Sequence, residues 1–218
     1  MGHGGQLCRI VAVLVALLTV GGLSAAVAAE APGLVAYWPL DTVTGQITPD
    51  LSGNEANLIV GLAQKVKGVS STGLKFDGKT AQARCMSAGS IDPATGLTIE
   101  AWVNLDGLDF SGFPSVVRKD GAYALRFSQS RIGMVLWFDG NPTSIGGKKT
   151  DWVTGRWYHL AATYDGTTMR TYVDGQQDDA LERPTDKPLD VSTAGAFVGS
   201  SPGQHSLKGT VDEVRLYN

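Results

Sequence analysis

Residues 97–105 read LTIEAWVNL, a pattern typical of a β-strand that is buried on one face. Every second position from Leu97 to Val103 is apolar, whereas Glu100 and Trp102 occupy positions between them. Because successive side chains of a β-strand point to opposite faces, the apolar residues share one face. The stretch therefore predicts a strand with one face in a core and with Glu100 and Trp102 on the other face.

Similar short runs, rich in β-branched and aromatic residues, lie on both sides of this strand. Asp-Gly pairs separate several of them, and Asp-Gly supplies the left-handed backbone that tight hairpin turns need. The pairs begin at Asp77, Asp120, Asp139, Asp165 and Asp174. The predicted strands are Leu34–Leu40, Asn57–Val60, Gly73–Phe76, Ala83–Met86, Leu97–Val103, Ser115–Lys119, Ala122–Phe127, Ile132–Phe138, Tyr158–Tyr164, Met169–Val173, Gly195–Gly199 and Lys208–Tyr217.

This pattern predicts an all-β fold. No stretch keeps a helical period, and about a dozen strands exceed what one open sheet usually holds. Two packed antiparallel sheets are therefore expected, in a β-sandwich of the jelly-roll type. The polar segment 175–190 is predicted to be a long surface loop between strands.

The N-terminus has the features of a secretory signal peptide. Arg9 precedes an apolar run that ends at Val20, and small residues surround Ala29. A basic start, an apolar run and small residues before the cleavage point are typical of such peptides. Residues 1–29 are therefore predicted to be removed, which leaves one secreted or extracytoplasmic domain, residues 30–218. The alternative is an uncleaved anchor, since the apolar stretch is just long enough to cross a bilayer.

The charge of the chain argues against two classes of partner, and its cysteine content argues against an internal disulfide. The chain has 18 basic and 21 acidic residues, and Arg9 leaves with the signal peptide. A weakly acidic domain argues against nucleic acid and against anionic membrane surfaces, so no membrane insertion is expected after cleavage. Cys8 also leaves, so Cys85 has no disulfide partner within the chain and is expected to be buried. We expect a monomer.

Several short motifs follow one another along the mature region. They are GLVAYWPLD (33–41), DLSGN (50–54), GLKFDG (73–78), LTIEAWVNL (97–105), WYHLAATYDG (157–166), TYVDG (171–175) and GTVDEVRLYN (209–218). In this order they resemble the laminin-G-like jelly-roll domains of the concanavalin A-like lectin and glucanase superfamily. The resemblance implies the fold. It does not imply one ligand, because that superfamily contains lectins, glycosidases, lyases and adhesion modules.

The resemblance also implies how the two ends of the domain are arranged. The final strand, Lys208–Tyr217, is expected to pair with the first strand, Leu34–Leu40. In the final strand Asp212, Val214 and Leu216 are predicted to face inward, with Asp212 at the rim of that face, and Glu213, Arg215 and Tyr217 are predicted to face outward.

The segment 50–54 offers oxygen ligands for a cation. Asp50 and Asn54 lie four residues apart, and calcium prefers carboxylate and amide oxygens. Members of the resembled family often bind calcium there, helped by an acidic residue of the closing strand, a position that Asp212 matches. The resemblance therefore implies a structural calcium site at Asp50, Asn54 and Asp212. The alternative is an Asx-turn without metal, in which Asp and Asn bond to nearby backbone.

Three strands carry candidate ligand-binding residues. By alternation, Glu100 and Trp102, Arg126, and Trp157 and His159 all point away from the core. If the three strands share one sheet, these side chains form an aromatic platform with polar neighbours, which suits a sugar ring. The alternative is that the aromatic residues form a second, minor core under the long loops.

The residues that catalysis would need are missing from the expected places. Laminarinase-type relatives carry an E-x-D-x-x-E strand, and here Glu100 lacks the second and third carboxylates that glycoside hydrolysis would use. His159, Tyr172 and Arg126 resemble the residue types of alginate-lyase relatives, but the lyase strand motifs are absent. The chain is therefore not expected to be an enzyme.

Two functions from different classes remain open. One is an extracellular glycan-binding module with structural calcium, and the other is an extracellular protein-interaction or adhesion module without a sugar site. A depression lined by exposed aromatic residues would indicate the first, and a flat apolar patch would indicate the second.

Overall fold

The computed structural model describes residues 33–86, 91–93, 95–183, 185–200 and 206–218. The regular elements of this part are all β-strands, which confirms the predicted all-β class. None of its residues forms a helix that is long and apolar enough to cross a membrane. The predicted signal peptide, residues 1–29, lies outside the described residues.

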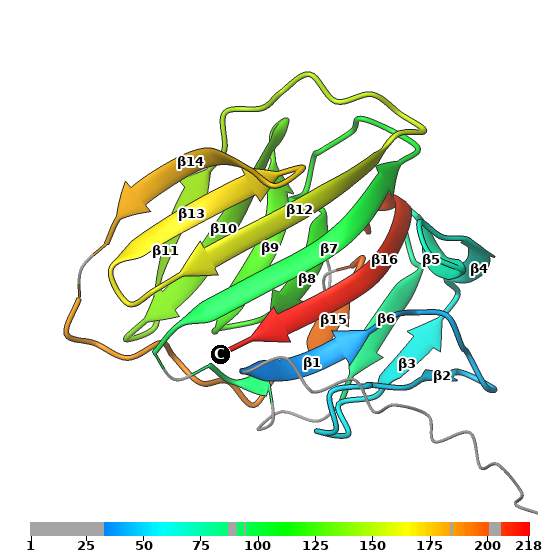
Figure 1. The fold of residues 1–218 in the computed structure, drawn as a ribbon, viewed down its shortest axis with the longest axis horizontal. Coiled ribbons are helices and arrows are strands. Elements are labelled where there is room, and N and C mark those ends of the chain that lie inside the picture. The colour runs from blue at the N-terminus through cyan, green and yellow to red at the C-terminus, as the bar shows by residue number, and fades with distance from the viewer. Residues whose placement is uncertain (1–32, 87–90, 94, 184, 201–205) are drawn as a thin grey trace, which may run out of the picture.

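Two antiparallel sheets pack face to face, which confirms the predicted sandwich (Figure 1). Sheet A runs in the order β14 (Gln176–Glu182), β13 (Thr168–Val173), β12 (Trp157–Tyr164), β7 (Leu97–Leu105), β16 (Lys208–Tyr217), β5 (Thr72–Asp77) and β4 (Gln64–Lys67), and β1 (Leu34–Trp38) also pairs with β16. Sheet B runs in the order β11 (Asn141–Gly146), β10 (Arg131–Phe138), β9 (Tyr123–Ser128), β8 (Ser115–Lys119), β15 (Ala196–Val198), β6 (Gln82–Cys85), β3 (Leu58–Gly61) and β2 (Ile47–Thr48).

The core fills the space between the inner faces of the two sheets. On β7 every second residue from Leu97 to Leu105 is buried, as the alternation predicted, and the residues between them are partly exposed. Each fully buried large apolar side chain contributes about 1.5–3 kcal/mol to folding. Cys85 is also buried, as expected. The side chains that leave the outer faces are therefore the ones available for function.

The closing strand β16 lies in the middle of sheet A. It pairs with β7 on one side and with both β5 and β1 on the other. Tyr217 lies opposite Leu34, so the first and last strands meet in one sheet, which confirms the arrangement that the family resemblance implied.

One prediction for this strand is wrong: Asp212 does not face inward with Val214 and Leu216. The register of β16 against β7 shifts just after Asp212, which marks a β-bulge, and Glu213 at the shift has a φ of 53°. An extra residue in one strand displaces its alternation. Asp212 therefore shares the outer face with Trp102, which lies directly opposite, while Val214 and Leu216 stay in the core.

Sheet A also has a strand where the sequence predicted none. β14 lies inside segment 175–190, so the prediction of a surface loop there is wrong for the first half of that segment. Asp174 and Gly175, with φ of 50° and 76°, form a two-residue hairpin turn between β13 and β14. β14 is an exposed edge strand with polar side chains, and so it has no apolar alternation that would mark it.

Candidate functional site

The outer face of sheet A carries four of the five predicted ligand-binding residues, the exception being on sheet B. Trp102 lies directly opposite His159 in the β7–β12 ladder, and Trp157 lies opposite Asn104. The rings of Trp102 and His159 meet edge to face, with centroids 5.3 Å apart. Both tryptophans are half-buried, so they belong to the surface of the sheet and not to a second core.

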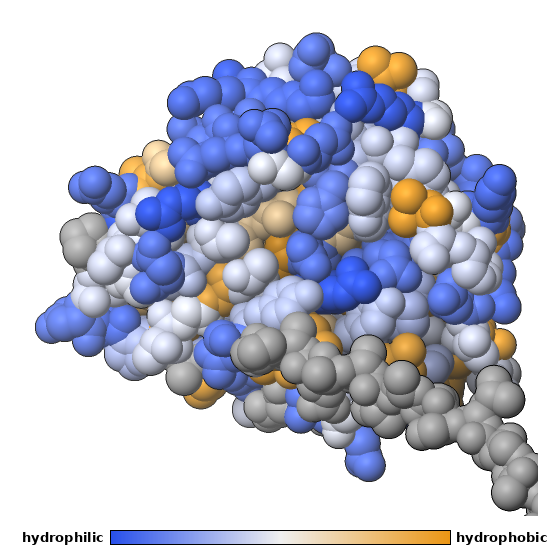
Figure 2. Space-filling model, viewed as in Figure 1, coloured by the Kyte–Doolittle hydropathy of each residue, from blue (hydrophilic) through white to orange (hydrophobic). Residues whose placement is uncertain are grey.

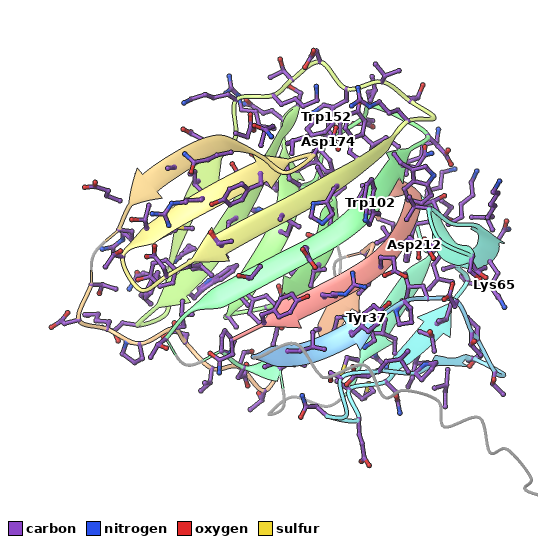
Figure 3. The ribbon with its side chains drawn as sticks, in the orientation of Figure 1. Tyr37, Lys65, Trp102, Trp152, Asp174 and Asp212 are labelled. Atoms are coloured by element: carbon purple, nitrogen blue, oxygen red, sulfur yellow. The ribbon has the colours of Figure 1, made fainter. Side chains whose placement is uncertain are left out.

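A hollow of about 580 Å³ opens on this face. Its lining residues are Trp102, Trp157, His159, Asp174 and Gly175. Figure 3 shows Trp102 and Asp174 on the same side of sheet A, and Figure 2 shows that this face is mainly hydrophilic, with hydrophobic residues in small separate groups. The volume lies within the range of small-ligand sites.

Asp174 fixes the rim of the hollow. Its Oδ1 accepts the backbone N–H of His159 at 2.9 Å, and its Oδ2 accepts a hydrogen bond from Nη2 of Arg156 at 2.7 Å. An ionised carboxylate can accept about four hydrogen bonds. Asp174 is therefore held in place and still has capacity to accept hydrogen bonds from a ligand.

Glu100 lies at the centre of a polar network beside the tryptophans. Its Oε1 accepts the hydroxyl of Tyr217 at 3.2 Å and lies 3.9 Å from Nη1 of Arg215. Its Oε2 lies 3.4 Å from Nε2 of His159. The hydrogen bond with His159 and the positive charge of Arg215 lower the pKa of Glu100, against the opposing effect of burial. The carboxyl group is therefore ionised at neutral pH and accepts hydrogen bonds.

The network continues across β16 to β1. Glu213 Oε2 accepts the hydroxyl of Tyr37 at 2.9 Å and Nη2 of Arg215 at 2.6 Å, and the Arg215 guanidinium lies 4.1 Å from the centroid of the Tyr37 ring. Burial and the hydrogen bond to Glu213 raise the pKa of Tyr37 to about 12. These mutual contacts hold the polar groups in fixed positions next to the hollow.

Arg126 is not part of this surface. The condition that the three strands share one sheet is not met for Ala122–Phe127, because β9 lies in sheet B between β8 and β10. Arg126 does leave the outer face of its own sheet, where its guanidinium carbon lies 4.4 Å from the centroid of the Phe113 ring. Alternation predicts which face of a strand a residue occupies, but it does not predict the sheet to which the strand belongs.

Asp50 and Asn54 belong to a turn between β2 and β3. Asp50 Oδ1 accepts the N–H groups of Tyr37 and Ser52, and Oδ2 accepts the Ser52 hydroxyl and the Ala56 N–H, at 2.8 to 3.0 Å. The side-chain amide of Asn54 donates to a backbone carbonyl of β1 at 3.1 Å. These contacts are those of the Asx-turn alternative, and they occupy the acceptor positions of the Asp50 carboxylate.

Asp212 lies in a separate network under the turn between β4 and β5. Its Oδ2 accepts the N–H groups of Val69 and Ser70 at 2.8 and 3.1 Å, and its Oδ1 accepts that of Glu213 at 2.9 Å. Burial raises the pKa of Asp212 to about 6, against the effect of these bonds. In the described part of the chain, no three His, Cys, Asp or Glu side chains come close enough to hold a metal. Calcium binding by the three residues stays a prediction.

Sequence reasoning did not assign Arg215, Tyr217, Tyr37, Asp174 or Gly175 to the site. Alternation already placed Arg215 and Tyr217 on the outer face of the last strand. The missing information was that β16 lies beside β7, which brings both side chains to Glu100. Asp174 and Gly175 were predicted only as a tight turn between strands.

Comparison with known protein families gives one match. Residues 77–218 match the family model of the concanavalin A-like lectin/glucanases superfamily. No curated protein matches this chain in sequence.

Several solved structures share the fold. Domain 4 of AbnA, a GH43 extracellular arabinanase from Geobacillus stearothermophilus solved in complex with arabinotriose, is 18% identical with a TM-score of 0.68, over 87% of this chain and 93% of that one. The binding domain of Paraclostridial Mosquitocidal Protein 1 is 18% identical with a TM-score of 0.66, over 85% of this chain and 48% of that one. Trypanosoma rangeli sialidase is 20% identical with a TM-score of 0.58, over 85% of this chain and 30% of that one. This chain therefore spans half or less of the length of the last two structures, and the likeness shows the fold.

Proposed function

Because this chain belongs to the concanavalin A-like lectin/glucanases superfamily, we propose that it is a secreted, non-catalytic module that binds carbohydrate on the outer face of sheet A. The observation that carries the proposal is the hollow of about 580 Å³ in which Trp102 and Trp157 meet polar groups. A depression lined by partly exposed aromatic residues is the feature that separates a glycan binder from a module with a flat apolar patch.

The chemistry of the hollow suits a sugar. The C–H face of a pyranose or furanose ring packs on an aromatic ring, and Trp102 and Trp157 offer two such rings on adjacent strands. Sugar hydroxyls need hydrogen-bond partners at the edge of that contact, and Asp174 and His159 lie there. Asp174 is held by its bonds to the His159 N–H and to Arg156, and the His159 ring by Glu100 and Trp102, so little side-chain entropy is lost on binding.

The charges of the site favour a neutral saccharide. The carboxylates of Asp174 and Glu100 flank the tryptophans; Asp174 pairs with Arg156, and Glu100 lies near His159 and Arg215. Carboxylates accept hydrogen bonds from sugar hydroxyls, whereas they repel a uronate or a sulfated sugar placed against them. Domain 4 of the arabinanase, solved with arabinotriose, supports a neutral oligosaccharide as the class of ligand to test first.

The state of Glu100 supports a non-catalytic role. A glycosidase needs a general acid whose pKa is raised, together with a second carboxylate across the scissile bond. Glu100 instead has a lowered pKa, because His159 and Arg215 favour its ionised form. Its two oxygens are engaged with Tyr217 and His159, as expected for a residue that fixes its neighbours.

The second candidate function is protein interaction, and one observation favours it. Leu108 and Phe113 are 48% and 43% exposed, and they line a second hollow of about 370 Å³ together with Phe110. Exposed apolar residues around a depression are typical of protein-binding sites. The first function is the better supported, because the tryptophan hollow combines apolar rings with positioned polar groups.

A glycan array tests the proposal. The full-length protein is expected to bind neutral oligosaccharides, and calorimetry with the best ligand should show at least a tenfold loss of affinity in Trp102→Ala and in Trp157→Ala, about 1.4 kcal/mol. Trp137→Ala is the matched control, since Trp137 is a half-buried tryptophan of sheet B. Equal losses in all three variants, or no binding of neutral glycans by the unaltered protein, would overturn the assignment.

A further inference from the structure

The outer face of sheet B has a smaller hollow of about 80 Å³ beside Arg126. Gly133 on β10 lies between Arg126 on β9 and Gly146 on β11, directly opposite both. Because the two glycines have no side chains, the sheet forms a bare floor next to the arginine. Ser128 and Ser144 also line the hollow. The place therefore combines a guanidinium, two hydroxyls and room for a small group.

Arg126 brings a positive charge to this hollow, and no carboxylate in the described part of the chain pairs with it. Among the described residues it forms no ion pair, and its contact is with the ring of Phe113 at 4.4 Å. Stacking uses the flat face of a guanidinium and leaves the N–H groups along its edge for another acceptor. Burial, together with the nearby charge of Arg118, lowers the pKa of Arg126, so an anion at its edge would offset both effects.

The other charges around the hollow are already engaged. Arg118 pairs with Asp120, and Arg131 donates to a backbone carbonyl at 3.0 Å. After the end of β11, Lys148 pairs with Asp179 of β14 at 3.0 Å. Arg126 is therefore the charge left to attract a ligand, with Arg131 adding a second positive charge close by.

We propose that the hollow at Arg126, over Gly133 and Gly146, binds one carboxylate or sulfate group of an acidic saccharide. The fork of N–H donors on a guanidinium matches two oxygens of such a group. The hydroxyls of Ser128 and Ser144 provide hydrogen-bond partners for the sugar that carries it. The volume suits one group, since a water molecule takes up about 30 Å³ in the liquid.

Two observations favour a saccharide over an acidic peptide. Peptides commonly bind by adding a strand to a sheet edge, but β9 and β10 are interior strands that are paired on both sides. Acidic peptide motifs are commonly held by clusters of arginines with free donors, whereas here Arg118 pairs with Asp120 and Arg131 donates to the Gly147 carbonyl. The saccharide part of the inference rests on the proposed function, while the anion part does not.

Calorimetry with the full-length protein at constant ionic strength tests this. The probes are a glucuronate oligosaccharide, a sulfated oligosaccharide, their neutral parent and polyglutamate. Arg126→Gln removes the charge, and Gly146→Val fills the floor of the hollow while leaving Arg126 in place. A Cβ at Gly146 would meet only the stem of Arg131, at 4.0 Å. Arg84→Gln is the matched control, because Arg84 is an exposed arginine on β6 of the same sheet.

At least one acidic oligosaccharide is expected to bind. The affinity for the neutral parent should be the same in the unaltered protein and in Arg126→Gln. Arg126→Gln and Gly146→Val should each weaken acidic binding at least tenfold, and Arg84→Gln by less than twofold. Trp102→Ala should leave the affinity for acidic oligosaccharides unchanged. A failure of the binding site proposed on sheet A can therefore be distinguished from a failure of the site at Arg126. Thermal melting checks each variant, with Gly146→Ala as a smaller replacement if the valine variant does not fold.

Three results would overturn the inference. One is that neither acidic oligosaccharide binds the unaltered protein. Another is an equal loss in Arg84→Gln, which would show that the attraction is a general effect of surface charge. The third is polyglutamate binding as tightly as a saccharide of similar charge, which would assign the hollow to acidic peptides.

Discussion

Asp212 lies directly opposite Trp102 across the β16–β7 ladder, so both side chains leave the outer face of sheet A (Figure 3). Their surroundings differ. Trp102 lines the open hollow, whereas Asp212 is fully buried beneath the turn between β4 and β5. The bulge at Glu213 produces this arrangement, because it turns Asp212 away from the core and under backbone N–H groups. A buried carboxyl group next to a binding surface has consequences that can be measured.

Asp212 should make the protein less stable as pH rises through weakly acidic values. Its pKa is raised from 3.8 to about 6 in the folded state, so its contribution is most favourable below about pH 4 and is lost as pH rises to about 6. A difference of two units corresponds to roughly 2–3 kcal/mol. Asp212→Asn removes this dependence. The free energy of unfolding, measured with urea from pH 4 to 7 in the presence of chelator, should therefore fall less in the variant.

Asp77→Asn is the control for that measurement. Backbone hydrogen bonds from the following turn lower the pKa of Asp77 to about 2, so its contribution is present above its unfolded pKa and is lost as pH falls. From pH 4 to 7 Asp77 stays ionised in the folded state and is mostly ionised in the unfolded state, so Asp77→Asn should leave the slope of the profile nearly unchanged, whereas Asp212→Asn should flatten it. An Asp212→Asn profile parallel to that of the unaltered protein would show that Asp212 is ionised throughout the range.

The predicted calcium site leads to a second expectation. Calcium should raise the melting temperature, because a metal that binds the folded state stabilises it by about 2.7 kcal/mol at a hundredfold excess over its dissociation constant. Chelator should reverse the rise. The rise should disappear in Asp212→Asn and persist in Asp77→Asn. No rise with calcium, or a rise that remains in Asp212→Asn, would contradict a site made by Asp50, Asn54 and Asp212.

Glu100→Gln should cost stability at neutral pH and little at low pH. The pKa of Glu100 is lowered, so its stabilising effect is present above its unfolded value and is lost as pH falls through the lower folded value. Hydrogen bonds to a charged group contribute about 1.5–3 kcal/mol, and the variant should lose a comparable amount at pH 6. Urea unfolding at pH 3 and pH 6 measures the difference. A loss that is equal at both values would mean that the charge of Glu100 is not what stabilises the network.

The inner and outer faces of most strands could be predicted from alternation alone. On β7 and β12, for example, the buried residues and the half-buried tryptophans are the ones that the period-two pattern indicated. Alternation fails where the chain adds a residue, as at Glu213, and where a strand has no apolar face, as in β14. Neither case leaves a pattern in the sequence, since a bulge is defined by the partner strand.

Which strands share a sheet could not be predicted from alternation, and the composition of the site depends on it. Arg126 and Trp102 both point outward, and only the pairing of β9 with β8 and β10 shows that they leave different sheets. Two hairpins could have been predicted more fully. Asp139-Gly140 and Asp174-Gly175 are two-residue turns with positive φ, and such a turn requires a second strand after it, here β11 and β14.

Deleting residues 211–218 should unfold the protein. Val211, Val214 and Leu216 are fully buried, and each contributes about 1.5–3 kcal/mol. The deletion also removes much of the pairing with β7 and all of the pairing with β1, which leaves buried backbone groups without partners. The apolar loss alone approaches the roughly 5–15 kcal/mol by which typical domains are stable.

A graded series separates this effect from a general intolerance of change at the C-terminus. Removing Asn218 alone should cost little, because it lies beyond β16, although its N–H donates to the Gly33 carbonyl. Leu216→Ala should cost about 2–5 kcal/mol, since the substitution leaves a cavity in the core. Circular dichroism and thermal melting follow the series. A cooperative melt of the 211–218 deletion within a few degrees of the full-length protein would show that β16, despite its central place in sheet A, is not needed to hold β7 and β1 together.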